Sequence, residues 1–444
     1  MTENSYNYKK QRRRKKIIRR RIICAVLIIA IIAAAVFIVK GCAAKSNNTN
    51  NTTSVSSAEP DVPHVVSTAT VASTGDILIH APILSNAYNK SADSYDFTNI
   101  FEHITPYFSA YDYMVANLEV TCGSTAAGKY SGYPVFNTPD SIVDALKGSG
   151  VDMLLTANNH SYDTGFNGMI RTVQVVKERG LAALGSIAAD GEGPFYCVKN
   201  INNVKIGMTC YTYSTTSNGR VALNGNIIKK EAEPLINTFD YYNLNAFYAD
   251  AEATVSAMKA GGAEVIIFYM HWGNEYWYKP SSYQKAMAQK LCDLGVDVII
   301  GGHPHVVQPF ETLTSESGHE TACIYSTGNA VSNQRKEIMD SDNYSGHTED
   351  GMIFTVTVEK WSTGEIKIKD VNILPTWVNL KTVNGKKVYQ IIPLDTSVSD
   401  WKQFGLSSTK NAVASYNRTM ALVGSGLNAY RTSHGMSAVT EKLK

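Results

Sequence analysis

The stretch VDVIIGGHPH, at residues 296–305, joins an apolar run to two glycines and two histidines. A short apolar run that ends at glycines predicts a buried β-strand. His303 and His305 lie two residues apart just beyond it, so a turn there can point both imidazoles at one centre. Two nearby histidines are more often a chance pair on the surface, but the preceding strand and glycines favour a shared site.

Five other polar motifs also follow apolar, strand-like runs. They are Gly75-Asp76, Asn117-Leu118-Glu119, Asn158-Asn159-His160, His271-Trp272-Gly273 and Gly328-Asn329. In open α/β sheets the ligand crevice lies beyond the carboxyl ends of the strands, where residues far apart in sequence meet. We therefore expect the Asp, Glu, Asn and His side chains of the six motifs to converge on one patch.

Helix-like segments alternate with these strand-like runs. The helix-like segments are residues 141–147, 167–179, 249–259 and 283–294, and residues 411–422 are weakly helical. Strands that alternate with helices of this length predict βαβ units with parallel strands. Antiparallel pairs are also expected, between residues 195–199 and 205–213 and between residues 352–358 and 365–371. The sequence therefore predicts a mixed α/β fold.

The composition is that of a folded protein with an uneven charge distribution. Of the 444 residues, 44% are hydrophobic and 18% are charged, which is ordinary for one large or two modest domains. Residues 1–45 carry twelve of the 41 Lys and Arg and one of the 39 acidic residues. The remainder has 29 basic and 38 acidic side chains, a net charge of −9. Because nucleic-acid backbones are bound by clustered Lys and Arg, nucleic acid is not expected as a partner.

The basic segment precedes an apolar segment that predicts a membrane anchor. Residues 22–39 are eighteen residues without a charged side chain. As a helix they extend about 27 Å, close to the bilayer core of about 30 Å. Lys and Arg on the amino side place residues 1–21 in the cytoplasm and the chain after Lys40 outside the cell membrane. A cleaved signal peptide and lipidation at Cys42 are the alternatives, but the apolar run is long for a signal peptide.

Beyond the anchor, residues 40–64 are rich in Asn, Ser and Thr and predict a flexible tether. The folded domain is expected at residues 65–380, followed by a C-terminal appendage at residues 381–444. The seven cysteines show no CxxC spacing, which disfavours a zinc ribbon. Buried thiols are expected for the five in the folded region, and a disulfide is the alternative.

The polar motifs contain the ligand types of a divalent-metal site. Carboxylates and imidazoles bind hard and borderline metals, among which Mn, Fe and Zn fit this set. Asp76 and Glu119 can offset the charge of a dication, although each alone is more often a helix cap or a surface carboxylate. Asn159 offers a neutral amide oxygen. His160 can act as an acid or base, with Asp163 placed one helical turn on to orient its ring.

The same motifs, taken in order, carry a family resemblance. They are Gly75-Asp76-Ile77-Leu78, Ala116-Asn117-Leu118-Glu119, Asn158-Asn159-His160 with Asp163, His271-Trp272-Gly273-Asn274-Glu275, Gly302-His303-Pro304-His305 and Gly328-Asn329-Ala330. Together they resemble the CapA family, the bacterial poly-γ-glutamate capsule synthesis proteins, whose domain is similar to calcineurin-like metallophosphoesterases. The resemblance covers about residues 71–335. It implies a four-layered α/β/β/α metallophosphatase-like domain, here preceded by the amino-terminal transmembrane helix.

The resemblance also implies roles for individual residues. One divalent metal ion would be held by Asp76, Glu119 and His305, and a second by Glu119, Asn159, His271 and His303. His160 would stay free as the general acid or charge stabiliser. His271, judged from its own surroundings, is equally well explained as a core histidine beneath aromatic residues.

This chain departs from the metallophosphoesterase pattern at two positions. Leu78 stands where those enzymes have the histidine of an Asp-x-His motif, and His80 lies close by. Glu119 is one methylene longer than their bridging aspartate. The number of bound metal ions therefore stays open, and so does phosphoester hydrolysis.

The function that the resemblance implies is synthesis, export or retention of an anionic capsule polymer, poly-γ-glutamate, by a protein anchored in the cell membrane. Trp272, Glu275 and Asn329 would then line the substrate pocket. The bilayer and other polymer synthesis subunits are the expected partners. Two alternatives remain: an extracytoplasmic metal-dependent phosphoesterase acting on a small phosphate ester, and a non-catalytic subunit that anchors a polymer synthase. Whether the chain is an enzyme is left open.

Overall fold

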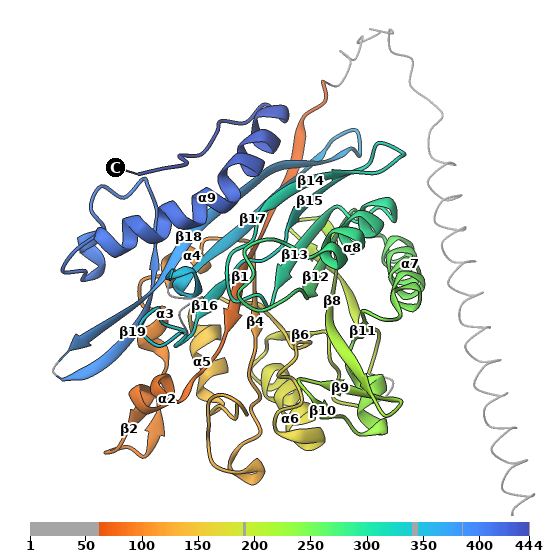
Figure 1. Ribbon diagram of the computed structural model, residues 1–444. Helices are drawn as coiled ribbons and strands as arrows, with labels where there is room; N and C mark the ends of the chain where they lie inside the picture. The colour runs from red at the N-terminus through yellow and green to blue at the C-terminus, as the bar shows by residue number, and fades with distance from the viewer. Residues whose placement is uncertain (1–61, 190–191, 340–344, 384, 444) are drawn as a thin grey trace, which may run out of the picture. The chain divides into compact units, whose positions relative to one another are not determined.

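Two large β-sheets form the centre of the folded region. The computed structural model describes residues 62–189, 192–339, 345–383 and 385–443. Contacts between residues group Pro63–Lys444 into one unit. The fold described below is that of this unit (Figure 1).

The first sheet contains eight strands in the order β19-β18-β17-β1-β4-β5-β6, and β16 also pairs with β1. Its strands are β1 (Val65–Ile77), β4 (Tyr113–Leu118), β5 (Met153–Leu155), β6 (Ala182–Leu184), β16 (Asn329–Val331), β17 (Asp350–Trp361), β18 (Ile366–Val383) and β19 (Lys386–Pro393). The strands β16, β1, β4, β5 and β6 pair in parallel. The strands β17, β18 and β19 extend the sheet from β1 in antiparallel pairs.

The second sheet contains nine strands in the order β10-β9-β8-β12-β13-β15-β14, and β7 and β11 pair with β8. Its strands are β7 (Tyr196–Ile201), β8 (Val204–Ser217), β9 (Arg220–Leu223), β10 (Asn226–Ile227), β11 (Thr238–Asp240), β12 (Val265–His271), β13 (Val298–Gly302), β14 (Phe310–Thr314) and β15 (Glu320–Ile324). The central strands β8, β12, β13 and β15 are parallel. All seven residues of β12 are buried, as expected for a central parallel strand covered on both faces.

Helices pack on the outer face of each sheet and, in the case of α9 (Lys410–Ser433), against strands of both sheets. The others are α2 (Ala81–Ala87), α3 (Thr98–Phe101), α4 (Thr105–Phe108), α5 (Ser141–Gly148), α6 (Gly165–Glu178), α7 (Leu244–Ala260) and α8 (Ser282–Asp293). Side chains of α2 to α6 pack on the first sheet, and those of α7 and α8 pack on the second. A capping box of Ser281 and Gln284 begins α8.

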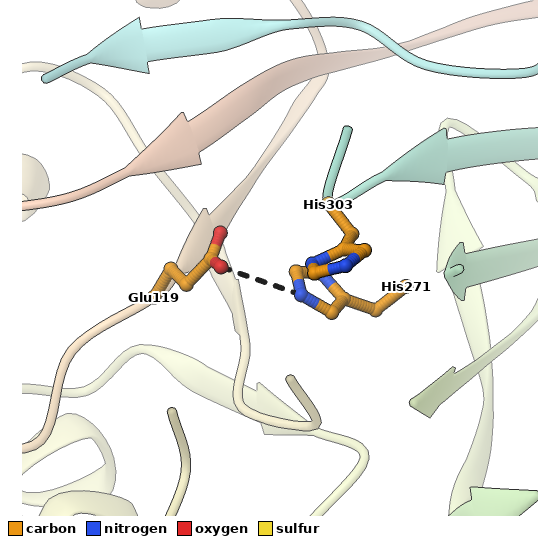
Figure 2. Close-up of side chains that lie close together, drawn as sticks. All are labelled: Glu119, His271 and His303. Atoms are coloured by element: carbon orange, nitrogen blue, oxygen red, sulfur yellow. Dashed lines mark ion pairs between the residues drawn. The ribbon is translucent and has the colours of Figure 1, made fainter. Parts of the chain in front are cut away.

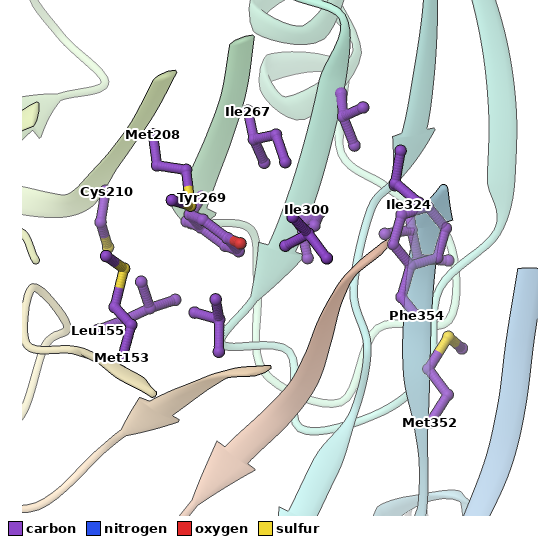
Figure 3. Packing of buried hydrophobic residues seen from close by; sticks show 14 of the residues in the cluster. Met153, Leu155, Met208, Cys210, Ile267, Tyr269, Ile300, Ile324, Met352 and Phe354 are labelled. Atoms are coloured by element: carbon purple, nitrogen blue, oxygen red, sulfur yellow. The ribbon is translucent and has the colours of Figure 1, made fainter. Parts of the chain in front are cut away.

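The largest hydrophobic cluster lies between the two sheets (Figure 3). Met153 and Leu155 reach it from the first sheet, while Met208, Ile267 and Tyr269 reach it from the second. Alternate residues of a strand point to opposite faces, so the other residues of β12 pack outward against α7 and α8. The layers are therefore helix, sheet, sheet and helix.

The predicted mixed α/β fold is confirmed, and it fits a metallophosphatase-like domain. The two antiparallel pairs expected from the sequence are β7 with β8 and β17 with β18. The helix expected at residues 249–259 is longer than predicted, since α7 begins at Leu244. The five cysteines of the folded region are all free thiols.

The C-terminal part of the chain packs on the same sheets. The appendage expected from residue 381 begins inside β18 and contains β19 and α9. Helix α9 contacts β17 and β18 of the first sheet and β14 of the second. Its Arg418 binds the buried Asp350 carboxylate through Nε at 2.7 Å and Nη2 at 2.6 Å. This contact fixes the chain just beyond Thr348, whose carbonyl oxygen accepts a hydrogen bond from Asn329.

The predicted membrane span, residues 22–39, lies outside the described residues. Within residues 62–443, apart from the gaps named above, no helix has the length and apolar character needed to cross a bilayer.

Candidate metal centre

The predicted ligands meet where the carboxyl ends of β1, β4, β12 and β13 face one another. Strand register brings them together. Asp76 of β1 pairs with Asn117 of β4 and with Asn329 of β16. His271 of β12 pairs with Gly302 of β13. A Cβ at Gly302 would lie 2.8 Å from Asp76 Oδ1, so only glycine permits this close approach of the two sheets. The expected convergence of the motifs is thus observed for these strand ends.

Asp76 is fully buried and receives three polar contacts. Its Oδ1 accepts a hydrogen bond from Asn117 Nδ2 at 2.7 Å, and its Oδ2 accepts one from the backbone N–H of His303 at 3.0 Å. His305 Nδ1 lies 3.2 Å from the same Oδ2. Burial acts to raise the pKa of Asp76, but the hydrogen bond and charge of His305 outweigh it and hold that pKa below its usual value. Asp76 is therefore an anion at neutral pH.

Glu119 is also fully buried and is the central carboxylate of the group. Its Oε1 lies 3.4 Å from His271 Nε2 (Figure 2). The same oxygen lies 3.8 Å from His305 Nε2 and has no hydrogen-bond partner. Burial and the nearby charge of Asp76 raise the pKa of Glu119. A buried carboxylate oxygen without a partner is costly, and a bound cation would remove that cost.

The turn that carries His303 and His305 has a strained backbone. Their φ angles are +94° and +57°, in the left-handed region that costs a residue with a side chain about 1–3 kcal/mol. The backbone N–H of Tyr276 donates to Pro304 O at 2.7 Å and holds the turn in place. This strain is concentrated where the two imidazoles are brought to one centre.

The two imidazoles of this turn differ electrostatically. Burial holds the pKa of His303 well below its ordinary value, and the charges of His271 and His305 lower it further. The His303 ring is therefore neutral and can donate a lone pair to a metal ion. Burial also acts to lower the pKa of His305, but the charges of Glu119 and Asp76 raise it to about 9. Without a metal ion, a protonated His305 would offset one negative charge of the two carboxylates.

Asn159, in the loop after β5, and His271, at the end of β12, complete the centre. His271 Nε2 lies 2.8 Å from Asn159 Oδ1, and the Asn159 amide nitrogen has no hydrogen-bond partner. The ring of Tyr213 packs 4.7 Å from that of His303 and lies parallel to that of His271. Packing against Tyr213 thus fixes the orientation of the His271 and His303 rings.

The donor set fits divalent metal ions. Two fully buried groups of three residues have ligand atoms within 4.8 Å of one another: Asp76, Glu119 and His305, and Glu119, His271 and His303. A third group joins the exposed Glu275 to His303 and His305. Glu119 belongs to both buried groups. The buried atoms His303 Nδ1 and Glu119 Oε1 lack hydrogen-bond partners. Two buried carboxylates with three imidazoles and unpaired donor atoms are the arrangement expected around one or two dications.

His160 lies beside the centre but belongs to none of these groups. Its Nδ1 lies 2.8 Å from Asp163 Oδ2, which also accepts the backbone N–H of Phe136 at 2.8 Å. The Phe136 ring meets the His160 ring edge to face at 4.8 Å. The carboxylate and the aromatic ring together fix the orientation of the imidazole, as expected for Asp163.

The three residues expected to bind substrate have different positions. Glu275 is exposed and its carboxylate lies near His303 and His305. Trp272 is fully buried in the cluster beneath α7 and α8, where its Nε1 donates to Tyr325 O at 2.9 Å. It follows His271 in β12 and therefore points to the opposite face of the sheet. Burial removes Trp272 from the residues that a substrate can reach.

Asn329 is also fully buried and lies beneath the histidine turn. Its Nδ2 lies 3.2 Å from the carbonyl oxygen of His305 and 2.9 Å from that of Thr348. It is positioned to support the turn from below rather than to contact substrate. The chain around Thr348 is in turn fixed by Arg418 of α9.

No role of its own was predicted from the sequence for Asn117, which opens the motif that contains Glu119. Its Nδ2 donates to Asp76 Oδ1 and lies 3.3 Å from Glu119 Oε2, so it holds the two carboxylates in place. His80 accepts the backbone N–H of Asn333 at its Nδ1, and burial lowers its pKa to about 4. Among the described residues, His80 belongs to none of the potential metal-binding groups.

Comparisons with known proteins agree on a single family. The family model described as bacterial capsule synthesis protein PGA_cap matches residues 70–334. The capsule biosynthesis protein CapA of Bacillus anthracis is 26% identical over 278 residues, which cover 60% of this chain and 60% of that protein. The PGA biosynthesis protein CapA of Bacillus subtilis is 26% identical over 335 residues, which cover 74% of this chain and 78% of that protein. A Mycobacterium tuberculosis protein described as a "probable polyglutamine synthesis accessory protein" is 27% identical over 213 residues, which cover 46% of this chain and 52% of that protein.

Proposed function

The chain belongs to the bacterial capsule synthesis protein family PGA_cap, and from that premise we propose that it serves in making, exporting or retaining an anionic capsule polymer, poly-γ-glutamate. The polymer is inferred from the Bacillus subtilis relative, which is described as a PGA biosynthesis protein. We propose that its metallophosphatase-like α/β/β/α domain uses a divalent-metal centre, and that other polymer synthesis subunits act with it, as the accessory role of the mycobacterial relative suggests. The observation that carries the metal centre is the buried Glu119 Oε1, which has two imidazoles nearby and no hydrogen-bond partner.

The chain's own residues divide into ligands and a proton carrier. Asp76, Glu119 and His305 would hold one metal ion, and Glu119, Asn159, His271 and His303 the other. When bound, such ions lower the pKa of water toward neutrality or polarise a carbonyl or phosphoryl oxygen. His160, oriented through Nδ1 by Asp163, can hold or deliver a proton at Nε2. This pair favours an enzymatic role, of which a phosphoesterase is one form, over a purely anchoring one.

A strain that lacks this chain tests the proposed function. We expect the amount of cell-surface poly-γ-glutamate, measured after acid hydrolysis of the washed cell fraction, to fall in that strain and to return with the wild-type chain. A full amount of surface polymer in the strain without the chain would contradict the proposal. Polymer that is made but released into the medium would narrow the role to retention.

We also propose that the chain is anchored in the cell membrane with its folded domain outside, because ten Lys and Arg precede residues 22–39. Protease added to intact protoplasts is expected to remove the folded domain, as detected by an antibody against residues 410–443. A cytoplasmic protein in the same protoplasts serves as the control and should stay intact. Protection of the domain until the protoplasts are lysed would reverse the proposed orientation.

A further inference from the structure

The two metal-binding groups do not have equal numbers of protein ligands. The group of Glu119, His271 and His303 gains a fourth donor from Asn159, whose Oδ1 lies 2.8 Å from His271 Nε2. The group of Asp76, Glu119 and His305 has only three. A metal ion at this second position needs further donors, since transition metals and zinc take four or more ligands.

The segment that follows Asp76 does not supply the missing donor. Leu78 is buried in the hydrophobic cluster beneath α2 to α6 and carries no donor atom. The Nδ1 atom of His80 accepts a hydrogen bond from the backbone of Asn333, and its ring packs on Phe136. The side chains of Leu78 and His80 are therefore committed to packing or to other contacts.

Glu275 approaches the centre from the other side. One of its carboxylate oxygens lies within 4.8 Å of a ring nitrogen of His303 and of one of His305. The segment that carries it is fixed on both sides: Gly273 N–H donates to Tyr241 Oη at 2.7 Å, and Tyr276 N–H donates to Pro304 O at 2.7 Å. Glu275 is thus attached to the same turn that presents the two histidines.

The charge balance favours a third carboxylate at this point. Asp76 and Glu119 supply two negative charges, which balance a single dication but only half of a pair. Glu275 is exposed, whereas the other two carboxylates are fully buried, so it can approach the metal position from the solvent side.

We propose that Glu275 is a metal ligand and that its carboxylate supplies the missing donor to the ion held by Asp76, Glu119 and His305. This assignment rests on the proposed metal centre and adds a residue to it. It also distinguishes Glu275 from a residue that binds substrate only, because its loss would weaken metal binding in the absence of any substrate.

The test is a titration of the full-length chain, purified in detergent, stripped with chelator and dialysed, with Mn²⁺ as the probe. Isothermal titration calorimetry should resolve two Mn²⁺ equivalents for the wild type. Glu275→Gln keeps the shape of the side chain and removes its charge. It should lower the affinity for one Mn²⁺ equivalent by at least about 10- to 100-fold, the range that loss of even an outer-sphere partner produces. The affinity for the other equivalent should stay near that of the wild type. Glu275→Asp should weaken the affected equivalent less.

Glu316→Gln is the matched control, since Glu316 is an exposed glutamate in the turn between β14 and β15 and belongs to none of the metal-binding groups. Two wild-type affinities in Glu275→Gln would overturn the assignment while leaving the metal centre intact. A wild-type chain that binds no Mn²⁺, Fe²⁺ or Zn²⁺ would overturn both together. Thermal unfolding of each variant, followed by circular dichroism, separates loss of a ligand from loss of the fold.

Discussion

Replacing His303 with alanine is expected to remove metal and function together. The His303 ring is buried, neutral and packed against both Tyr213 and His271, and its Nδ1 has no hydrogen-bond partner. His303→Ala removes one imidazole from the group of Glu119, His271 and His303 and leaves that metal position with fewer ligands. Metal content, measured by elemental analysis of the purified chain, should fall by at least one equivalent, and cell-surface polymer should fall to the level of the strain without the chain.

The control for His303→Ala is His434→Ala, at the end of α9, where the imidazole contacts Glu320, Ser433 and Tyr430. It should keep both its metal and its polymer. Wild-type metal content in a folded His303→Ala chain would show that the imidazole is structural. Because alanine relieves the strained φ of +94° only in part, the stability of the fold must be measured for this variant as well.

His160→Ala should separate catalysis from metal binding. His160 is held by Asp163 and Phe136 rather than by the ligand groups, so the metal content of this variant is expected to stay near that of the wild type. If the centre is catalytic, turnover should fall by about 10²- to 10⁴-fold, the usual contribution of a positioned acid or base. Asp163→Asn keeps the shape of the partner and should reduce turnover less.

The outcome in cells decides between the two classes of function. Wild-type surface polymer in His160→Ala, with the chain present at its normal level, would favour a non-catalytic anchoring subunit. Loss of metal from His160→Ala would instead place this imidazole among the ligands. His103→Ala is a suitable control, because His103 packs against Phe404 away from the centre.

The strands and the ligand positions could be predicted because both depend on local pattern. An apolar run followed by a polar motif marks a strand end, and the carboxyl ends of parallel strands meet at one edge of a sheet. His303 and His305 were placed correctly by this argument alone. The short helices α3 and α4, with four residues each, are too short to show a helical period, and no pattern predicted them.

The roles of Trp272 and Asn329 could not be predicted because they depend on which side of an element faces the site. His271 and Trp272 are neighbours in sequence, but strand alternation turns one toward the centre and the other into the core under α7 and α8. Asn329 contacts the carbonyl oxygen of Thr348, which lies nineteen residues further along the chain. Contacts between distant segments of this kind leave no periodic signal in the sequence.

The membrane-anchored polymer role is a proposal built on the family, whereas the metal centre is built on the geometry of this chain. The most direct test of that centre is elemental analysis of the full-length chain, purified in detergent without chelator. We predict at least one tightly bound divalent transition-metal ion per chain, lost in His303→Ala and kept in His160→Ala. A wild-type chain without bound metal, and with no uptake from Mn²⁺, Fe²⁺ or Zn²⁺ supplied in excess, would contradict the account.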